Sequence, residues 1–155
     1  MSSTPADFDV TRLNDLLGRE SVSAWVDLRQ DTIDLFGDVT GDRQWIHVDP
    51  ARARHDSPHG TTIAHGFLTL ALMSRLLREA VPLGCRPGVA INYGLNKVRF
   101  PSPLPAGSRV RGRFTLAHLE PVSGNAWQAT WSAVIEREGS EKPCCVAEWL
   151  VRYYP

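Results

Sequence analysis

The sequence has no hydrophobic run long enough to cross a bilayer and no excess of charge of one sign. A membrane-spanning helix needs roughly 20 consecutive apolar residues. The opening segment, MSSTPADFDV, has neither the basic part nor the apolar part of a secretory signal. The 17 basic and 17 acidic residues give a formal net charge of zero, which disfavours nucleic acid or an acidic membrane surface as a main partner. We therefore expect a cytoplasmic protein that binds neither nucleic acid nor membrane.

Cysteine is also scarce. The three cysteines are Cys85 and the adjacent pair Cys144 and Cys145. An odd number of cysteines without metal-ligand spacing argues against a disulfide framework and against a zinc site. Reduced thiols of a cytosolic protein are the expectation. The sequence predicts no metal and no cofactor.

The chain does have the length and the apolar content of one globular domain. Its 155 residues are 43% apolar and 22% charged, which is enough to build a hydrophobic core without disulfides or metals. There is no internal repeat, low-complexity tract or linker. We expect a single domain over residues 1–155.

Helical periodicity marks the first half of the chain, and strand patterns mark the second half. The expected elements are a helix over 11–18, a strand over 21–28, a helix over 30–39, a polar segment over 42–58, a helix over 64–79, and strands over 89–100, 108–119, 126–138 and 143–154. Asp31 and Asp49 are expected to be helix N-caps. The run over 64–79 is apolar on nearly its whole circumference, as in a helix buried against a sheet. The predicted class is α+β, a curved antiparallel sheet of about five strands wrapped around one long helix.

The stretch from Gly41 to Gly66 carries the residues best suited to chemistry. Asp42 precedes His47 by five residues in a turn-prone segment, where we expect no regular structure before a short helix at Pro50. Ala64-His65-Gly66 then leads into the apolar helix. An acid and a histidine at this spacing alone are more typical of a solvated turn. Beside a helix N-terminus, they are the proton-transfer pair that chemistry at a carbonyl group requires.

The motifs and the order of elements together resemble the MaoC-like family of (R)-specific enoyl-CoA hydratases, the hydratase 2 type, which has the hot-dog fold. The resemblance extends over nearly the whole chain from about Val22. Family members commonly have Asn-Pro where this chain has Gln44-Trp45. Proline would stiffen that turn, and we expect the Trp45 ring to restore rigidity by packing. The matching residues are Phe36, Gly41-Asp42, His47, Asp49-Pro50, Ile63-Ala64-His65-Gly66, Phe100, Pro103 and Gly107.

The resemblance implies a substrate, a reaction and an assembly. The family hydrates trans-2-enoyl-CoA thioesters reversibly to (R)-3-hydroxyacyl-CoA, and its domains pair into a homodimer whose two sheets join. The family's catalytic acid and histidine fall on Asp42 and His47, which together can hold a water molecule for addition to the substrate. Its backbone amide donor to the thioester carbonyl falls on Gly66. The sequence leaves open which of Asp42 and His47 is the base and which the acid.

Other polar residues have both a functional and a structural interpretation. We expect His65 to hold the loop or the helix start by hydrogen bonds rather than to act as a second catalyst. Ser74 either binds substrate in the acyl pocket or is a satisfied core serine. Asn92 either faces the site from its strand or lies at an exposed edge. Five basic residues either bind the CoA phosphates or form the solvent-exposed (wet) face of a strand. They are Lys97, Arg99, Arg109, Arg111 and Arg113.

Two other functions remain possible from the sequence. A hot-dog thioesterase usually carries a carboxylate on or near its buried helix, and residues 67–77 contain no Asp or Glu. A non-catalytic subunit that binds acyl-CoA is the other alternative. The intact Asp42/His47 pair argues against it, and the Gln44-Trp45 departure keeps it open. Neither the acyl chain length nor the metabolic pathway follows from the sequence.

Overall fold

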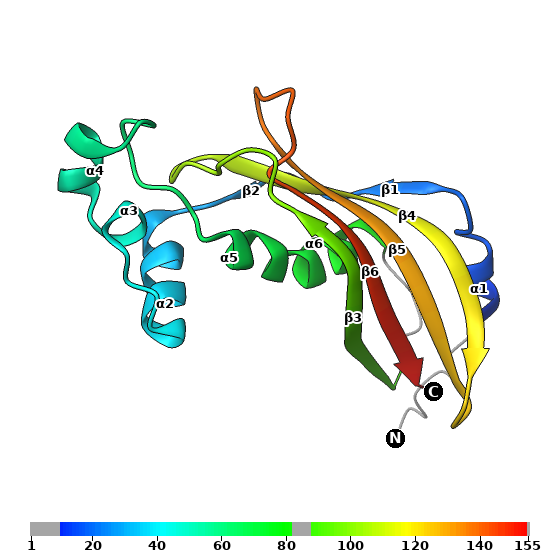
Figure 1. The fold of residues 1–155 in the computed structure, drawn as a ribbon. Helices are drawn as coiled ribbons and strands as arrows, with labels where there is room; N and C mark the ends of the chain where they lie inside the picture. The colour runs from blue at the N-terminus through cyan, green and yellow to red at the C-terminus, as the bar shows by residue number, and fades with distance from the viewer. Residues whose placement is uncertain (1–9, 82–87, 155) are drawn as a thin grey trace, which may run out of the picture.

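A curved antiparallel sheet packs over a helix in the computed structural model, which describes residues 10–81 and 88–154 (Figure 1). The helices are α1 (Val10–Asn14), α2 (Gln30–Thr40), α3 (Trp45–Val48), α4 (Pro50–Asp56), α5 (Gly66–Ala71) and α6 (Met73–Ala80). The strands are β1 (Glu20–Val22), β2 (Val26–Asp27), β3 (Val89–Arg99), β4 (Arg109–Val122), β5 (Ala126–Arg137) and β6 (Cys145–Tyr154).

The sheet has the strand order β1-β4-β5-β6-β3, and β2 pairs with β4 alongside β1. All of these pairings are antiparallel. β3 is an edge strand whose register against β6 shifts twice, between Asn92 and Gly94 and between Leu95 and Lys97. Each shift leaves one extra residue on β3, and such bulges bend a strand and redirect its side chains.

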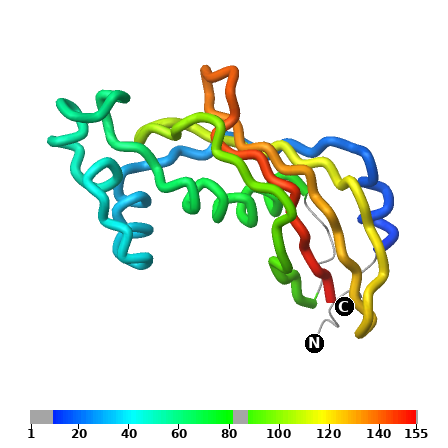
Figure 2. The backbone as a smooth tube through the Cα atoms, viewed as in Figure 1, coloured from blue at the N-terminus to red at the C-terminus, as the bar shows by residue number. Residues whose placement is uncertain are grey.

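The core lies between the concave face of the sheet and the central helix. Met73, Leu76 and Leu77 of α6 are buried among sheet residues that include Phe114 and Trp131. β6 alternates strictly between buried and half-buried residues, because successive side chains of a strand point to opposite faces. Figure 2 shows the long strands curving past the helix in the same direction.

The predicted α+β class is confirmed, and two details differ. The strand expected over 21–28 is divided into β1 and β2, so the sheet has six strands. Ser23 lies at the division, where its backbone N–H donates to Gly112 O at 2.9 Å. The central helix is not buried all round, since Phe67 is 72% exposed. Its two segments meet at Leu72, where i→i−4 hydrogen bonds continue through the junction.

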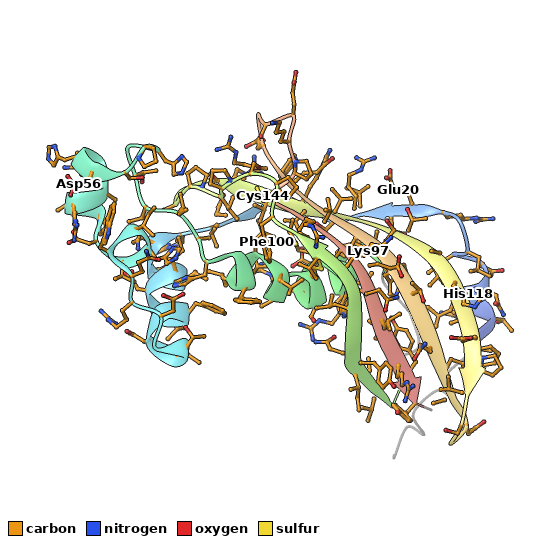
Figure 3. All side chains as sticks on the ribbon, viewed as in Figure 1. Glu20, Asp56, Lys97, Phe100, His118 and Cys144 are labelled. Carbon is orange, nitrogen blue, oxygen red and sulfur yellow. The ribbon has the colours of Figure 1, made fainter. Side chains whose placement is uncertain are left out.

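The short helices α2, α3 and α4 form an arm at one end of the sheet (Figure 1). Figure 3 shows Asp56 of this arm and His118 of β4 at opposite ends of the molecule. Backbone hydrogen bonds join the segment after the arm to the segment before β4: Ala64 N–H donates to Leu104 O at 2.7 Å, and Ala106 N–H donates to Thr62 O at 2.9 Å. The arm is thereby tied to the sheet.

Three local expectations can be compared with the arm. α3 is a turn of helix in the segment where we expected no regular structure, so that expectation was wrong. Arg29, not Asp31, is the N-cap of α2, and Asp31 instead pairs with Arg29. Asp49 does cap α4, its carboxylate accepting from Arg52 N–H at 3.0 Å. Among the residues described, no helix is long and apolar enough to span a membrane.

Candidate active site

His47 lies in α3, with its ring held in one orientation. Its Nδ1 lies 2.7 Å from the carbonyl oxygen of Ile63. A carbonyl oxygen can only accept a hydrogen bond, so Nδ1 carries the proton and donates. The neutral ring therefore has its lone pair on Nε2. This is the tautomer in which Nε2 can accept a proton from water.

His65 supports this arrangement from the N-cap position of α5. Its Nε2 donates to the carbonyl oxygen of Asp42 at 2.8 Å, and its ring stacks on that of His47 with centroids 3.8 Å apart. The side chain is almost fully buried. These contacts match the supporting role expected for His65, because they fix the backbone of Asp42 and one face of His47.

Asp42 reaches the two histidines because α2 ends sharply at Gly41. Gly41 has a φ of 75°, a left-handed conformation that glycine adopts without steric cost. Gly37 allows close approach one turn earlier, since a Cβ there would lie 3.1 Å from Asp42 O. A carboxylate oxygen of Asp42 and one ring nitrogen each of His47 and His65 lie within 4.8 Å of one another. The structure thus brings Asp42 and His47 together as predicted.

This trio has the donor types of a metal site. Nδ1 of His47 and Nε2 of His65 are bonded to carbonyl oxygens, which leaves one nitrogen of each ring for a further contact. The same three groups are also suited to exchanging a proton with a water molecule held between them.

Gly66 is the first residue of α5, beside the histidine pair. The N-cap residue His65 makes no side-chain capping hydrogen bond, so the first backbone N–H groups of the helix are not capped. Such groups carry the positive end of the helix dipole and suit a developing oxyanion. Phe100 packs over this position, and a Cβ on Gly66 would lie 3.2 Å from its ring.

A pocket of about 340 Å³ lies between β3 and the central helix, where Phe67 and Ser74 are the first and last helix residues that line it. Ser74 and Asn92 both line it, and Asn92 Nδ2 donates to Ser74 Oγ at 3.3 Å. Two residues singled out separately in the sequence are therefore hydrogen-bonded partners in one pocket. The apolar residues that line the same pocket include Phe67, Leu70, Met73, Leu95 and Trp149.

The basic residues considered for CoA binding divide into two groups. Arg109, Arg111 and Arg113 pair with acidic side chains on the outer face of the sheet, as the wet-face interpretation expects. Lys97 and Arg99 have no ion pair with any residue that the structure describes. Both are exposed on β3, and Figure 3 shows Lys97 on that strand.

Trp45 is the first residue of α3, the position at which proline suits a helix. Its ring lies under the Arg52 guanidinium, whose carbon is 4.4 Å from the ring centroid. This cation–π contact joins α3 to α4. The expected packing of Trp45 is therefore present.

Two of the three cysteines are described by the structure. Cys144 and Cys145 are buried, and Cys85 lies outside the described residues. Burial raises the pKa of the Cys144 thiol and raises the pKa of Cys145 to about 12. Thiols in this state are protonated at neutral pH and are poor nucleophiles.

Two residues that contact the site have no signal in the sequence. The Gln30 side chain donates to the carbonyl oxygen of His47, and the Thr62 hydroxyl donates to Gln30. Neither belongs to a motif, and 32 positions separate them in the chain. Only the folded arrangement shows that they meet.

The fold and the site define a hot-dog protein with an acid–histidine pair at the start of its central helix. The model of the MaoC-like domain matches residues 14–135, and the chain belongs to this family. It is 55% identical over 132 residues to 3-hydroxyacyl-thioester dehydratase Z of Mycobacterium tuberculosis, covering 84% of this chain and 85% of that protein. It is 43% identical over 140 residues to nodulation protein N of Rhizobium leguminosarum, covering 90% and 85%.

Solved structures agree on the fold. The (R)-hydratase from A. caviae involved in PHA biosynthesis aligns with a TM-score of 0.72 and 22% identity, covering 90% of this chain and 96% of that one. The MaoC-like dehydratase from Rhodospirillum rubrum aligns with a TM-score of 0.73 and 23% identity, covering 92% and 95%.

Proposed function

We propose that this chain catalyses the reversible hydration of trans-2-enoyl-CoA thioesters to (R)-3-hydroxyacyl-CoA without a cofactor. Relatives named 3-hydroxyacyl-thioester dehydratase and 3-hydroxybutyryl-CoA dehydratase support a hydratase or dehydratase role. The observation that carries the proposal is the convergence of Asp42 and His47 beside the first residue of α5. Water activation and carbonyl polarisation are both available there.

In the proposed mechanism, one water molecule lies between Asp42 and His47. Nε2 of His47 or the Asp42 carboxylate accepts a proton from this water as its oxygen bonds to C3 of the enoyl group. The proton returns to C2, so the elements of one water add across the double bond. Positioned acid–base groups of this kind typically contribute about 10²–10⁴-fold in rate.

Negative charge that develops on the thioester oxygen requires a fixed donor. The N–H of Gly66 serves as that donor, at the positive end of the central helix. The absence of a side chain at Gly66 lets the Phe100 ring pack directly against the start of the helix. The acyl chain then extends along the pocket toward Ser74, eight residues further on, which is about 12 Å at the rise of an α-helix.

Replacing Gly66 with alanine is expected to lower turnover by roughly 10–100-fold, because small misplacements of reacting groups have effects of this order. The new methyl group would press on the Phe100 ring at 3.2 Å and displace the helix start that carries the amide donor. Initial rates with crotonyl-CoA give the measurement, and thermal unfolding gives the control for folding. Wild-type turnover in Gly66→Ala would remove the amide donor from the mechanism.

We also propose that two copies of the chain pair through β3. This edge strand exposes Val89, Ile91, Tyr93 and Leu95, each between 42% and 52% exposed. Apolar side chains on an open edge favour pairing with another strand. Joining two β3 strands would continue the sheet across the dimer, as the fold family implies.

The dimer can be tested by light scattering. The wild-type protein is expected to have twice the 17.2 kDa mass of the chain, and Ile91→Lys is expected to shift it toward monomer, because burying the ammonium would be costly. Val22→Lys is the matched control, since Val22 is an exposed valine of β1 at the opposite side of the sheet. An active wild-type monomer would contradict the proposed pairing.

Crotonyl-CoA distinguishes the proposed reaction from the alternatives. A hydratase removes the ultraviolet absorbance of the conjugated enoyl thioester without releasing thiol, whereas a thioesterase releases thiol. The central helix argues against the thioesterase, because the acid within α5 and α6 is Glu79, near the far end and paired with Arg75. Binding without either change would identify a non-catalytic subunit.

A further inference from the structure

Gln30 is bonded to three groups around His47. It is the first residue of α2 and is partly buried. Its Nε2 donates to the carbonyl oxygen of His47 at 2.7 Å and to Oδ1 of Asp34 at 2.8 Å. Its Oε1 accepts from the hydroxyl of Thr62. All three polar groups of the amide, two N–H donors and one oxygen, are therefore used.

These partners fix which way the amide points. A backbone carbonyl and a carboxylate both accept hydrogen bonds, so both must face the NH₂ group. Turning the amide by 180° would place its oxygen against two acceptors. Only the Thr62 hydroxyl can adapt to either orientation. Gln30 is thus held in one orientation, with its donors toward His47 and Asp34.

The contacts close a ring around His47. Gln30 binds the carbonyl oxygen of His47, and Ile63 O accepts from the imidazole Nδ1 of the same residue. Ile63 N–H donates to the carbonyl oxygen of Ile46 at 3.0 Å. Thr62, next to Ile63 and only 1% exposed, completes the ring by donating to Gln30. Both the backbone and the side chain of His47 are therefore held from the same pair of segments.

α3 depends on contacts of this kind for its orientation. It has only four residues, and its N-cap Gln44 makes no side-chain capping bond. A single helical turn is not stable on its own. The Thr62 end of the ring is anchored to the body of the protein, because Ala106 N–H donates to Thr62 O. The ring thus holds His47 in a fixed position relative to the sheet.

We infer that Gln30 and Thr62 are positioning residues that hold the His47 imidazole, with Nδ1 donating, in place for proton transfer. The expected effects on kcat rest on the proposed hydratase function. The clamp, by which we mean the hydrogen-bonded ring that joins Gln30, Thr62 and Ile63 to His47, does not depend on that function. Loss of the clamp lets α3 turn and misplaces Nε2 of His47. Displacements of about 1 Å at a reacting group can cost roughly 10²-fold.

Gln30→Met removes the hydrogen bonds while keeping the length of the side chain, and Thr62→Val removes the hydroxyl while keeping its shape. Both variants are expected to lower kcat for crotonyl-CoA by roughly 10–100-fold, with KM changed by less than about threefold. Thr62→Ser keeps the hydroxyl and is expected to retain most of kcat. Gln128→Met is the matched control, since Gln128 also bonds two side chains but lies on β5, and its kcat is expected to remain unchanged.

The background of the variant His47→Gln separates positioning from general stability. With the imidazole gone, adding Gln30→Met is expected to leave the residual rate unchanged, because residues that act as one unit are non-additive. A further large loss in that background would overturn the inference. So would a Gln30→Met enzyme with wild-type kcat, or a Thr62→Ser enzyme as impaired as Thr62→Val.

A spectroscopic measurement tests the clamp independently of the reaction. In long-range ¹H–¹⁵N spectra of the histidine-labelled protein, His47 is expected to show the Nδ1-protonated form in the wild type. The variant Gln30→Met is expected to shift the His47 ring signals, and Gln128→Met to leave them in place. Unchanged His47 signals in Gln30→Met would overturn the inference. If the spectra behave as expected while the protein does not hydrate crotonyl-CoA, the proposed function fails and the clamp stands.

Discussion

Asp42→Asn and His47→Gln are each expected to lower the turnover of crotonyl-CoA by about 10²–10⁴-fold, the usual contribution of a positioned acid or base. Asparagine cannot take a proton from water, and glutamine cannot relay one. Neither change should disturb the core, because Asp42 is exposed and His47 is only partly buried. The loss should therefore appear in kcat while the sheet stays folded.

An exposed acid of α2 and a distant exposed histidine provide matched controls for these two variants. Asp38→Asn removes an exposed acid of α2 that pairs with Arg43, and His118→Gln removes an exposed histidine at the opposite end of the molecule (Figure 3). Both are expected to keep wild-type turnover.

Combining Asp42→Asn with His47→Gln is expected to lower turnover little more than the more damaging single change, since the pair acts as one unit. If both single variants keep near wild-type rates, the proposed site is wrong.

Gly112→Ala is expected to destabilise the fold more than any other small change considered. A Cβ at Gly112 would lie 2.3 Å and 2.6 Å from ring atoms of Phe114, which is fully buried, and 3.0 Å from Cβ of Leu76. The ring is part of the hydrophobic core, and overpacking of this kind typically costs about 1–3 kcal/mol. For a protein of this size, a loss at the upper end corresponds to a fall in Tm of roughly 6–12 °C.

Gly94→Ala is the matched control for this substitution. Gly94 is also a strand glycine, but its added Cβ would meet only Leu150 Cδ1, at an ordinary 3.8 Å. Thermal unfolding followed by circular dichroism should separate the two variants clearly. Equal melting temperatures would show that Phe114 and α6 can rearrange around position 112 more easily than their packing indicates.

Much of the fold could be predicted because its long elements repeat a simple pattern. The alternation along β6 and the apolar run of α5 and α6 are local properties of the sequence. α3 could not be predicted in this way, because one turn of helix has no periodic signal. Its conformation depends on partners such as Gln30 and Ile63, which are distant in sequence. The exposure of Phe67 likewise depends on which side of the helix the sheet covers.

The site was predictable in its residue types but not in its geometry. Asp42 and His47 were singled out by their spacing together with the Ala64-His65-Gly66 segment and the family resemblance, and the structure brings them together. The hydrogen bond from His65 to the carbonyl oxygen of Asp42 joins residues 23 positions apart, so no local sequence pattern predicts it. Trp45 shows how a departure from a motif can be accommodated. It occupies the first helical position of α3, where proline would stiffen the turn. Its ring instead contacts Arg52 on α4.

The placement of the proposed reacting residues on the α2–α4 arm predicts two separate kinds of stability. The arm carries Asp42 and His47, whereas most of the buried apolar side chains belong to the sheet and to α6. Subglobal opening, in which a weakly packed unit detaches while the core stays intact, is common in proteins. If the proposed site is correct, detachment of this arm is expected to abolish activity reversibly while the sheet stays folded. On heating, activity is then expected to be lost at a lower temperature than the circular dichroism signal of the strands.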